Sequence, residues 1–314
     1  MLTLDQVPRQ AIDLPGGTVR YRDVGVGPPL VFIHGLLVNG DLWRKVVPTL
    51  AATSRCILPD LPLGGHQPAF PADADLSMPG LARLVADFLA ALDLRDVTLV
   101  GNDSGGGICQ MVIALHPARV ARLVLTNCDA FENLPPPLLR PIAFAARQPI
   151  LRDLLASSLR LSVVQRLLYR LVARRFPEPP IARSYFAPLA DRGTRRDAVK
   201  MLAAASNRDL LVAAEAFAAF TGQVLIVWAP ADRLLFPLRY GERLRDAFPD
   251  ARLETVADSL TFVPEDQPER LAALIAAFLA RSPAVAAEQA FPAMADPPRS
   301  QPVAEEVVGS TTSR

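Results

Sequence analysis

An acidic side chain stands in a glycine-rich turn, and this turn is where the sequence most clearly suggests chemistry. Residues 101–107 read Gly-Asn-Asp-Ser-Gly-Gly-Gly, between the apolar run 97–100 and the helical pattern 108–116. A sharp turn from strand to helix exposes its central side chain, and it needs small neighbours because the two backbones pass close together. The pattern therefore predicts a nucleophile elbow at the tip of a buried strand.

Asp103 and Ser104 are the two candidates for the central side chain of this elbow. A Gly-x-Ser-x-Gly pattern would need glycine at position 102, where Asn102 stands, whereas Gly101 and Gly105 flank Asp103 symmetrically. The sequence thus favours Asp103, with Ser104, or a glycine turn without chemistry, as the alternative. Because the amides at a helix start favour negative charge, we expect the Asp103 carboxyl to be ionised at neutral pH.

Bases for such a nucleophile are scarce, because the chain has only three histidines. His66 lies in the loop after the strand pattern 55–61, and loops that follow parallel strands gather at one edge of a sheet. His66 is therefore a candidate to face Asp103, although a turn or surface role is the alternative. His116, before Pro117 at a helix end, is expected to be structural.

Around the elbow, strand and helix patterns alternate. Strands are expected at residues 11–14, 18–23, 29–33, 55–61, 97–100, 120–128, 224–228 and 253–257. Helical spacing occurs at residues 41–52, 81–92, 108–116, 240–247 and 268–279. This alternation predicts right-handed β-α-β units, and so an α/β fold with a mostly parallel sheet flanked by helices.

The alternation stops after residue 130. Up to about residue 220 the pattern is helical, rich in Leu, Ala and Arg, and without a strand candidate. Beyond Arg281 the chain is dominated by Ala, Pro, Ser and Glu with little periodicity. The expected division is 1–130 and 221–281 for the α/β core, 131–220 for a helical cap over one end of the sheet, and 282–314 for a disordered tail.

Composition limits the classes of function. With 51% hydrophobic residues in 314 and a net charge of +1, the chain has ample core and no charge suited to nucleic acid. Its three cysteines lack C-x-x-C spacing, which argues against disulfides and zinc. No signal peptide and no membrane span is recognisable. We expect a cytoplasmic protein that binds a small molecule, with no cofactor or metal and no nucleic-acid or membrane partner; its oligomeric state is not indicated.

Five short motifs follow one another at the expected strand ends. They are Phe32-Ile33-His34-Gly35, Pro59-Asp60-Leu61-Pro62, Val100-Gly101-Asn102-Asp103-Ser104-Gly105-Gly106, Val227-Trp228-Ala229-Pro230-Ala231-Asp232 and Val263-Pro264-Glu265-Asp266-Gln267-Pro268. In their order and spacing, residues 11–281 resemble the α/β-hydrolase superfamily, in particular its members with an aspartate nucleophile, the haloalkane dehalogenases and epoxide hydrolases. The resemblance implies that fold, but it does not imply a substrate.

The resemblance also implies roles for individual residues. Asp103 would be the nucleophile, and the backbone N–H groups of Leu36 and Ser104 would form the oxyanion hole. Asp232 stands at the place of the catalytic acid, which in the family orients a histidine. Asp129, after the preceding strand, is the alternative place that some members use.

One expected residue is missing. Thr261 stands where the family has its histidine, in the stretch Asp258-Ser259-Leu260-Thr261-Phe262-Val263. A threonine hydroxyl cannot act as a base near neutral pH. An ester formed on an aspartate nucleophile would therefore be hydrolysed slowly, unless another base such as His66 replaces the histidine.

No subfamily fits closely. Haloalkane dehalogenases follow the nucleophile with tryptophan, where Ser104 stands here, and epoxide hydrolases use cap tyrosines, for which Tyr169 and Tyr185 are available. The leading hypothesis is a cofactor-independent hydrolase of a small apolar ester, epoxide or carbon–halogen compound, with Asp103 as nucleophile or base. The alternatives are a lyase or isomerase, and a ligand-binding protein that has lost the catalytic histidine.

Overall fold

A mostly parallel sheet of eight strands forms the centre of the chain, which a computed structural model describes for residues 3–281. Across the sheet the strands follow the order β1-β2-β4-β3-β5-β6-β7-β8. β2 runs antiparallel to β1 and β4, and all other neighbours are parallel. The strands are β1 (Gln10–Leu14), β2 (Gly17–Val24), β3 (Pro29–Ile33), β4 (Arg55–Asp60), β5 (Val97–Asp103), β6 (Val120–Cys128), β7 (Gln223–Trp228) and β8 (Ala251–Thr255).

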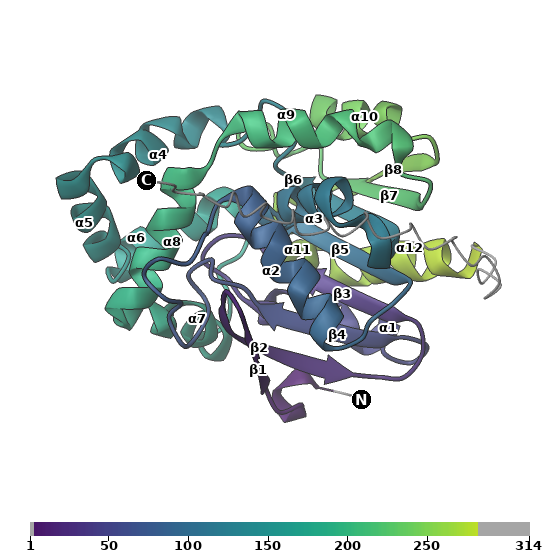
Figure 1. Cartoon of the computed structure of the whole chain (residues 1–314), viewed down its shortest axis with the longest axis horizontal. Coiled ribbons are helices and arrows are strands. Elements are labelled where there is room, and N and C mark those ends of the chain that lie inside the picture. Colours follow the sequence, from purple (N-terminus) through teal and green to yellow (C-terminus); the bar gives the residue numbers. More distant parts are fainter. Residues whose placement is uncertain (1–2, 282–314) are drawn as a thin grey trace, which may run out of the picture.

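Helices cover both faces of this sheet. α2 (Met78–Ala91), α3 (Ser104–Leu115) and α10 (Leu238–Ala247) pack on one face, and α1 (Val47–Leu50) and α12 (Pro268–Arg281) pack on the other. In Figure 1, α2 and α3 lie in front of the sheet and α12 lies behind it. Because both faces are covered, β3 and β5 are buried along almost their whole length, as their continuous apolar sequences predict.

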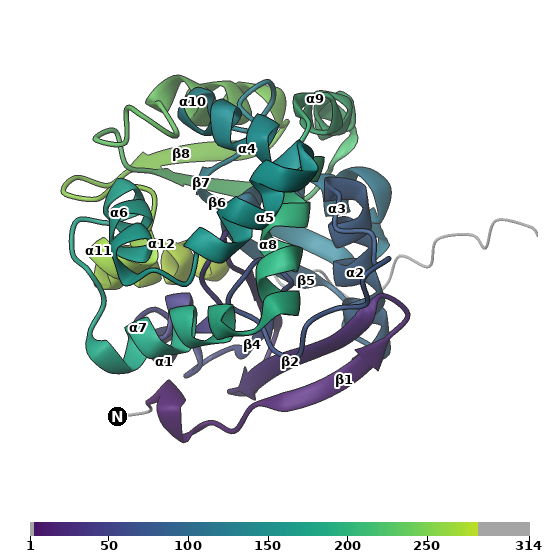
Figure 2. The same cartoon turned by 90° about the vertical axis from the view of Figure 1, so that its left-hand side faces the viewer.

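The other helices lie between β6 and β7 in the sequence, apart from α11 (Val263–Asp266) near the end. They are α4 (Arg140–Arg147), α5 (Pro149–Ser158), α6 (Ser162–Val172), α7 (Pro179–Phe186), α8 (Arg192–Ala204) and α9 (Asn207–Glu215). Short 3-10 helices occur at Leu4–Gln6, Gly40–Trp43, Pro117–Arg119, Pro137–Leu139, Ala187–Ala190 and Phe217–Ala219. α4 to α8 gather at one end of the molecule, as Figures 1 and 2 show.

The expected boundaries of core and cap stay a prediction, and the expected tail at 282–314 lies outside the described residues. α9 falls in the range expected for the cap, yet its Leu210 and Ala213 join the apolar cluster of the core beside α3. Within residues 3–281, no helix combines the length and apolar character needed to cross a membrane. The helix expected at 41–52 is instead a 3-10 turn and the short α1, which has Pro48 in its first turn.

Candidate active site

Asp103 ends β5 and precedes the first residue of α3, at the carboxyl edge of the sheet. Its backbone angles, φ 54° and ψ −130°, lie in a region that residues with a side chain rarely adopt. The neighbouring backbones leave no room for larger residues. A Cβ atom at Gly105 would lie 2.3 Å from the Ile33 carbonyl oxygen, and one at Gly106 would lie 2.3 Å from the Cys128 Cβ. These contacts explain the run of glycines after the elbow.

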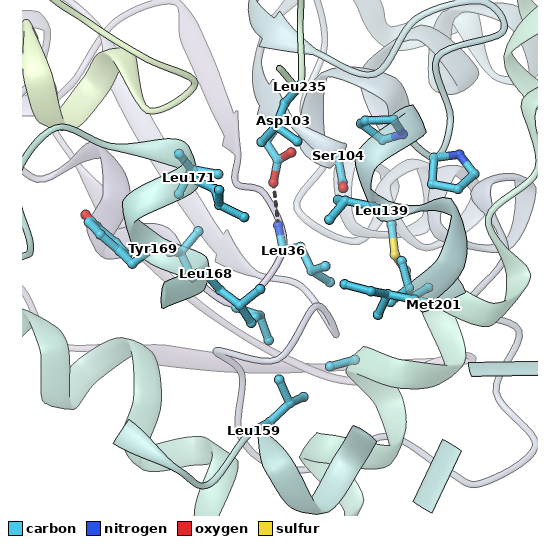
Figure 3. A pocket seen from close by; sticks show the side chains of 18 of the residues that line it. Leu36, Asp103, Ser104, Leu139, Leu159, Leu168, Tyr169, Leu171, Met201 and Leu235 are labelled. Atoms are coloured by element: carbon cyan, nitrogen blue, oxygen red, sulfur yellow. Dashed lines mark hydrogen bonds between the residues drawn. The ribbon is translucent and has the colours of Figure 1, made fainter. Parts of the chain in front are cut away.

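Backbone amides hold the Asp103 carboxylate. The Leu36 N–H donates to Asp103 Oδ2 over 2.9 Å, drawn as the dashed line in Figure 3, and the Ser104 N–H also donates to the carboxylate. Burial raises the pKa of Asp103 to about 6, although the two amides oppose this rise and the nearby Asp232 charge adds to it. Asp103 therefore titrates close to neutral pH and is mostly ionised above it.

The Thr261 hydroxyl is hydrogen-bonded to the carboxylate of Asp232, which lies in the loop after β7. Thr261 Oγ1 donates to Asp232 Oδ2 over 2.6 Å, and both side chains are buried. The Thr261 carbonyl in turn accepts from Asn102 Nδ2 at 2.7 Å, which fixes the loop beside the elbow. Asp232 and residue 261 are thus paired as an acid and its histidine would be, but with a hydroxyl in place of an imidazole.

Asp232 has further donors on its other oxygen. The Leu235 and Phe236 N–H groups donate to Asp232 Oδ1 at 3.1 Å and 3.3 Å. Burial nevertheless raises the pKa of Asp232, against the effect of these donors and of Thr261. The carboxylate therefore has donors on both oxygens, and the one at residue 261 is a hydroxyl that is not a base.

The structure does not bring His66 to Asp103. The His66 ring is 1% exposed, and it is absent from the lining of the cavity beside the elbow. Its Nδ1 accepts from the Gly64 N–H at 3.3 Å, and its Nε2 lies 3.2 Å from Asp197 Oδ2 on α8. His66 therefore joins a core loop to the cap helix α8, and its use as the replacement base is not supported by this arrangement.

The other two histidines are also remote from the chemistry. His34 Nε2 accepts from the Leu61 N–H at 2.8 Å, and burial lowers the pKa of His34 to about 4, so the ring is neutral and supports the loop. His116 caps the far end of α3. All three histidines of the chain are described, and none lines the cavity.

Asp129, which the sequence offered only as an alternative position for the catalytic acid, lies in the same cavity as Asp103. It follows β6 and is 2% exposed. Its Oδ1 is buried without a hydrogen-bond partner. Burial, with the charge of Asp103 in addition, raises the pKa of Asp129 well above its ordinary value, a shift that favours the protonated carboxyl. An aspartate directly after a strand that neighbours the elbow strand was the sequence signal for it.

The cavity in front of Asp103 is almost entirely apolar. It has a volume of about 190 Å³ and is lined by side chains of α5, α6 and α8, such as Leu168 and Met201, and by Leu159 directly after α5 (Figure 3). Its polar lining residues are Asp103, Ser104, Asp129, Ser158, Gln165 and Tyr169. A cavity of this kind suits a small apolar molecule with one reactive polar group.

Neither cap tyrosine offers its hydroxyl to Asp103. The Tyr169 ring lines the cavity, but in Figure 3 its hydroxyl points away from Asp103. Tyr185 does not line the cavity, and its hydroxyl donates to Glu265 Oε1 at 2.8 Å. The tyrosine pair that the resemblance to epoxide hydrolases implied is therefore turned away from the site.

Comparison with known proteins places this site in a family. The alpha/beta hydrolase fold family matches residues 28–268. The chain belongs to this family. "Haloalkane dehalogenase 2" of Mycobacterium tuberculosis is 28% identical over 270 residues, which cover 84% of this chain and 92% of that protein. A "Haloalkane dehalogenase" of Mesorhizobium japonicum is 37% identical over 116 residues, but these cover only 37% of each chain.

A solved structure of an epoxide hydrolase has the same fold, with a TM-score of 0.75. It is 21% identical and covers 88% of this chain and 99% of its own, so the likeness concerns the fold alone. The expected α/β-hydrolase fold is thus confirmed. The chain is an α/β-hydrolase-fold protein whose relatives include haloalkane dehalogenases and, by fold, epoxide hydrolases.

Proposed function

We propose that this protein is an enzyme that attacks a small, largely apolar substrate with the Asp103 carboxylate. The observation that carries the proposal is the position of this carboxylate, at the elbow, hydrogen-bonded by the Leu36 N–H and facing a leucine-lined cavity. The relatives named haloalkane dehalogenases support a hydrolase. In the first step a carboxylate oxygen forms a bond to an electrophilic carbon of the substrate, and the bond from that carbon to its leaving group breaks.

An oxygen leaving group suits the site better than a halide. Neither tryptophan of the chain, Trp43 or Trp228, lines the cavity, so no indole N–H is available for a leaving halide. Asp129, in contrast, lines the same cavity as Asp103, and burial together with the Asp103 charge favours its protonated form. When an epoxide ring opens, its oxygen carries away the electron pair and can take this proton. We therefore favour a small apolar epoxide as the substrate.

The second half of hydrolysis is where this site is weak. Water must add to the carbonyl carbon of the Asp103 ester, and the oxyanion that forms would accept from the Leu36 and Ser104 N–H groups. The water proton needs a base, and Thr261 donates its own proton to Asp232 instead of accepting one. The ester on Asp103 should therefore persist for long enough to be detected.

Intact mass spectrometry tests this proposal directly. The protein is incubated with panels of small epoxides, haloalkanes and esters, and an adduct on Asp103, mapped by peptide digestion, is the expected result. An epoxide should add its whole mass, a haloalkane its alkyl group with loss of halide, and an ester its acyl group with loss of the alcohol. The Asp103→Asn variant is the control and should remain unmodified. Absence of both an adduct and turnover with all three panels would rule out Asp103 as a nucleophile for these substrates.

A second candidate is proton transfer without a covalent step, as in a lyase or isomerase. It is favoured by the two carboxyls of the cavity, because the pKa of Asp103 is about 6 and the pKa of Asp129 is raised further, and such a difference divides acid and base roles between two carboxyls. Turnover without any adduct, with solvent deuterium entering the product, would favour this candidate. Binding without either outcome would favour a protein that has lost its chemistry.

A further inference from the structure

The outer surface of the cap carries large apolar side chains in contact with solvent. Ile150 is 85% exposed, and other members are more than half exposed. We call this set the cap face; it consists of Phe144, Ile150, Leu154, Leu161, Val163 and Leu167. On α5 and α6 these residues recur four apart, so each helix turns one apolar row outward. Exposed apolar patches of this kind often mark surfaces that bind a protein or a membrane.

The same helices are also apolar on their inner side. Leu155 of α5 and Val164 and Leu168 of α6 line the cavity in front of Asp103. A helix that only roofs a cavity would present polar residues to water on its other side. The outward apolar rows of α5 and α6 therefore need a separate explanation.

Positive charge accompanies the cap face. Residues 138–176 contain eight arginines and one acidic residue, Asp153, although the whole chain has a net charge of only +1. The arginines, all exposed, are Arg140, Arg147, Arg152, Arg160, Arg166, Arg170, Arg174 and Arg175. In the described part of the chain only Arg152 among them forms an ion pair, at 3.7 Å from Asp153. The positive charge of residues 138–176 is therefore largely unpaired, whereas positive and negative charges nearly balance over the whole chain.

We propose that the cap face docks on the surface of a bilayer that contains anionic lipids. Its apolar side chains would enter the boundary between headgroups and acyl chains, and the surrounding arginines would meet lipid phosphates, as in amphipathic helices that lie in the interface. Figures 1 and 2 support the geometry, because α4, α5 and α6 lie together at one end of the molecule, where a flat surface can reach them. This docking does not depend on the proposed reaction of Asp103.

A second copy of the chain fits this face less well. A symmetric dimer would place the same surface on both partners, and so would bring the arginine-rich region of one copy against that of the other. Lipid phosphates are free of this repulsion. Docking would also bring the roof of an apolar cavity to the phase in which small apolar molecules are most concentrated.

Vesicle flotation with the full chain tests the proposal. Vesicles of phosphatidylcholine alone are compared with vesicles containing about a third phosphatidylglycerol, at low and high salt. We expect binding to the anionic vesicles only, weakened by salt because exposed charges are screened. The variant Ile150→Ser with Leu154→Ser should bind about tenfold more weakly. Val26→Ser is the matched control. Val26 is 88% exposed but lies just before the amino end of β3, whereas Asp103 and its cavity lie at the carboxyl ends of the strands. This variant should bind as the unmodified protein does.

Three results would overturn this docking. The first is equal flotation of the unmodified protein and the double variant, and the second is no flotation of the unmodified protein with anionic vesicles. The third is a dimer in sedimentation, without vesicle binding, that the double substitution dissociates, because the cap face would then pair with a second copy. Since both substitutions replace exposed side chains, thermal unfolding of the variant should match that of the control, which excludes misfolding as the cause.

Discussion

In the proposed reaction, Thr261 limits how far the chemistry at Asp103 can proceed. Its hydroxyl donates a hydrogen bond to Asp232 over 2.6 Å, so Asp232 is paired with a group that has no basicity. This hydrogen bond also supplies a donor to the buried carboxylate of Asp232, and a buried carboxylate without that donor would lower the stability of the fold. Thr261 thus preserves the fold of the site while it removes the base from it.

Thr261→His should restore release of the covalent intermediate. An imidazole at this position would accept a proton from water while Asp232 orients it, and a positioned base contributes about 10²–10⁴-fold. The measurement is the decay of the Asp103 adduct, followed by mass spectrometry after removal of substrate. Thr261→Val is the control, because it removes the hydroxyl without adding a base and should not speed release. Equal decay in all three proteins would mean that residue 261 does not face the ester.

Asp103→Asn should stabilise the protein at high pH. Burial raises the pKa of Asp103 to about 6 from its ordinary 3.8, so the folded state keeps a proton that the unfolded chain has lost, and stability falls as pH rises through this window. At pH 8 the charge on Asp103 then costs about 3 kcal/mol, a penalty that asparagine avoids.

Urea unfolding at several pH values measures this effect. The variant should exceed the unmodified protein in free energy of unfolding by about 1–3 kcal/mol at pH 8, with the difference shrinking towards pH 4. Asp73→Asn, at an exposed position, controls for the loss of one negative charge. A difference that is constant with pH, or a variant less stable at pH 8, would contradict the placement of a buried charge at Asp103.

At the scale of elements, the turn from β5 to α3 depends on backbone contacts that only glycine allows. Gly105→Ala should destabilise the protein by about 3 kcal/mol, because its Cβ would lie 2.3 Å from the Ile33 carbonyl oxygen, which belongs to a central strand and cannot move. Gly107→Ala is the matched control on the same helix. Its Cβ would meet the flexible Met78 Cε at 3.1 Å, so a smaller loss is expected. Similar urea midpoints for the two variants would contradict the close crossing.

The same elements show what a sequence can predict. The strands at 29–33 and 97–100 were predicted because strands buried on both faces are continuously apolar, and both are present as β3 and β5. The order of these strand ends sufficed to place Asp103, Asp232 and residue 261 at one edge of the sheet. Such local patterns carry most of the fold.

Contacts between distant segments could not be predicted in this way. His66 was expected to be able to face Asp103, but it pairs with Asp197, which lies 131 residues further along the chain. The direction of the Tyr185 hydroxyl depends likewise on Glu265, far away in the sequence. Helical spacing predicts that a cap exists, but not which way its side chains turn.

At the scale of the whole molecule, one buried carboxylate joins the cap to the core. Glu265 of α11 accepts from Arg44 Nη2 at 2.8 Å, on the core side, and from the Tyr185 hydroxyl of the cap helix α7 at 2.8 Å. Burial alone would raise the pKa of Glu265, but hydrogen bonds and charge from Arg44 outweigh it and hold the pKa below its ordinary value. Glu265 also stands four residues after Thr261, so it links the cap to the loop that completes the site.

Glu265→Gln should therefore loosen the cap as well as lower stability. An amide of the same shape leaves the Arg44 charge unpaired, which costs about 3 kcal/mol in a buried pair. In the unmodified protein this contribution is present above the ordinary pKa of glutamate and is lost as pH falls through the lowered pKa, so the two proteins should converge in acid. Hydrogen exchange should be faster in α7 of the variant, whereas Glu269→Gln, at an exposed position of α12, should leave it unchanged. If α7 exchanges equally in both variants, α7 is held by its other contacts, such as the hydrogen bond from the Ser184 hydroxyl to Asp41, and not by Glu265.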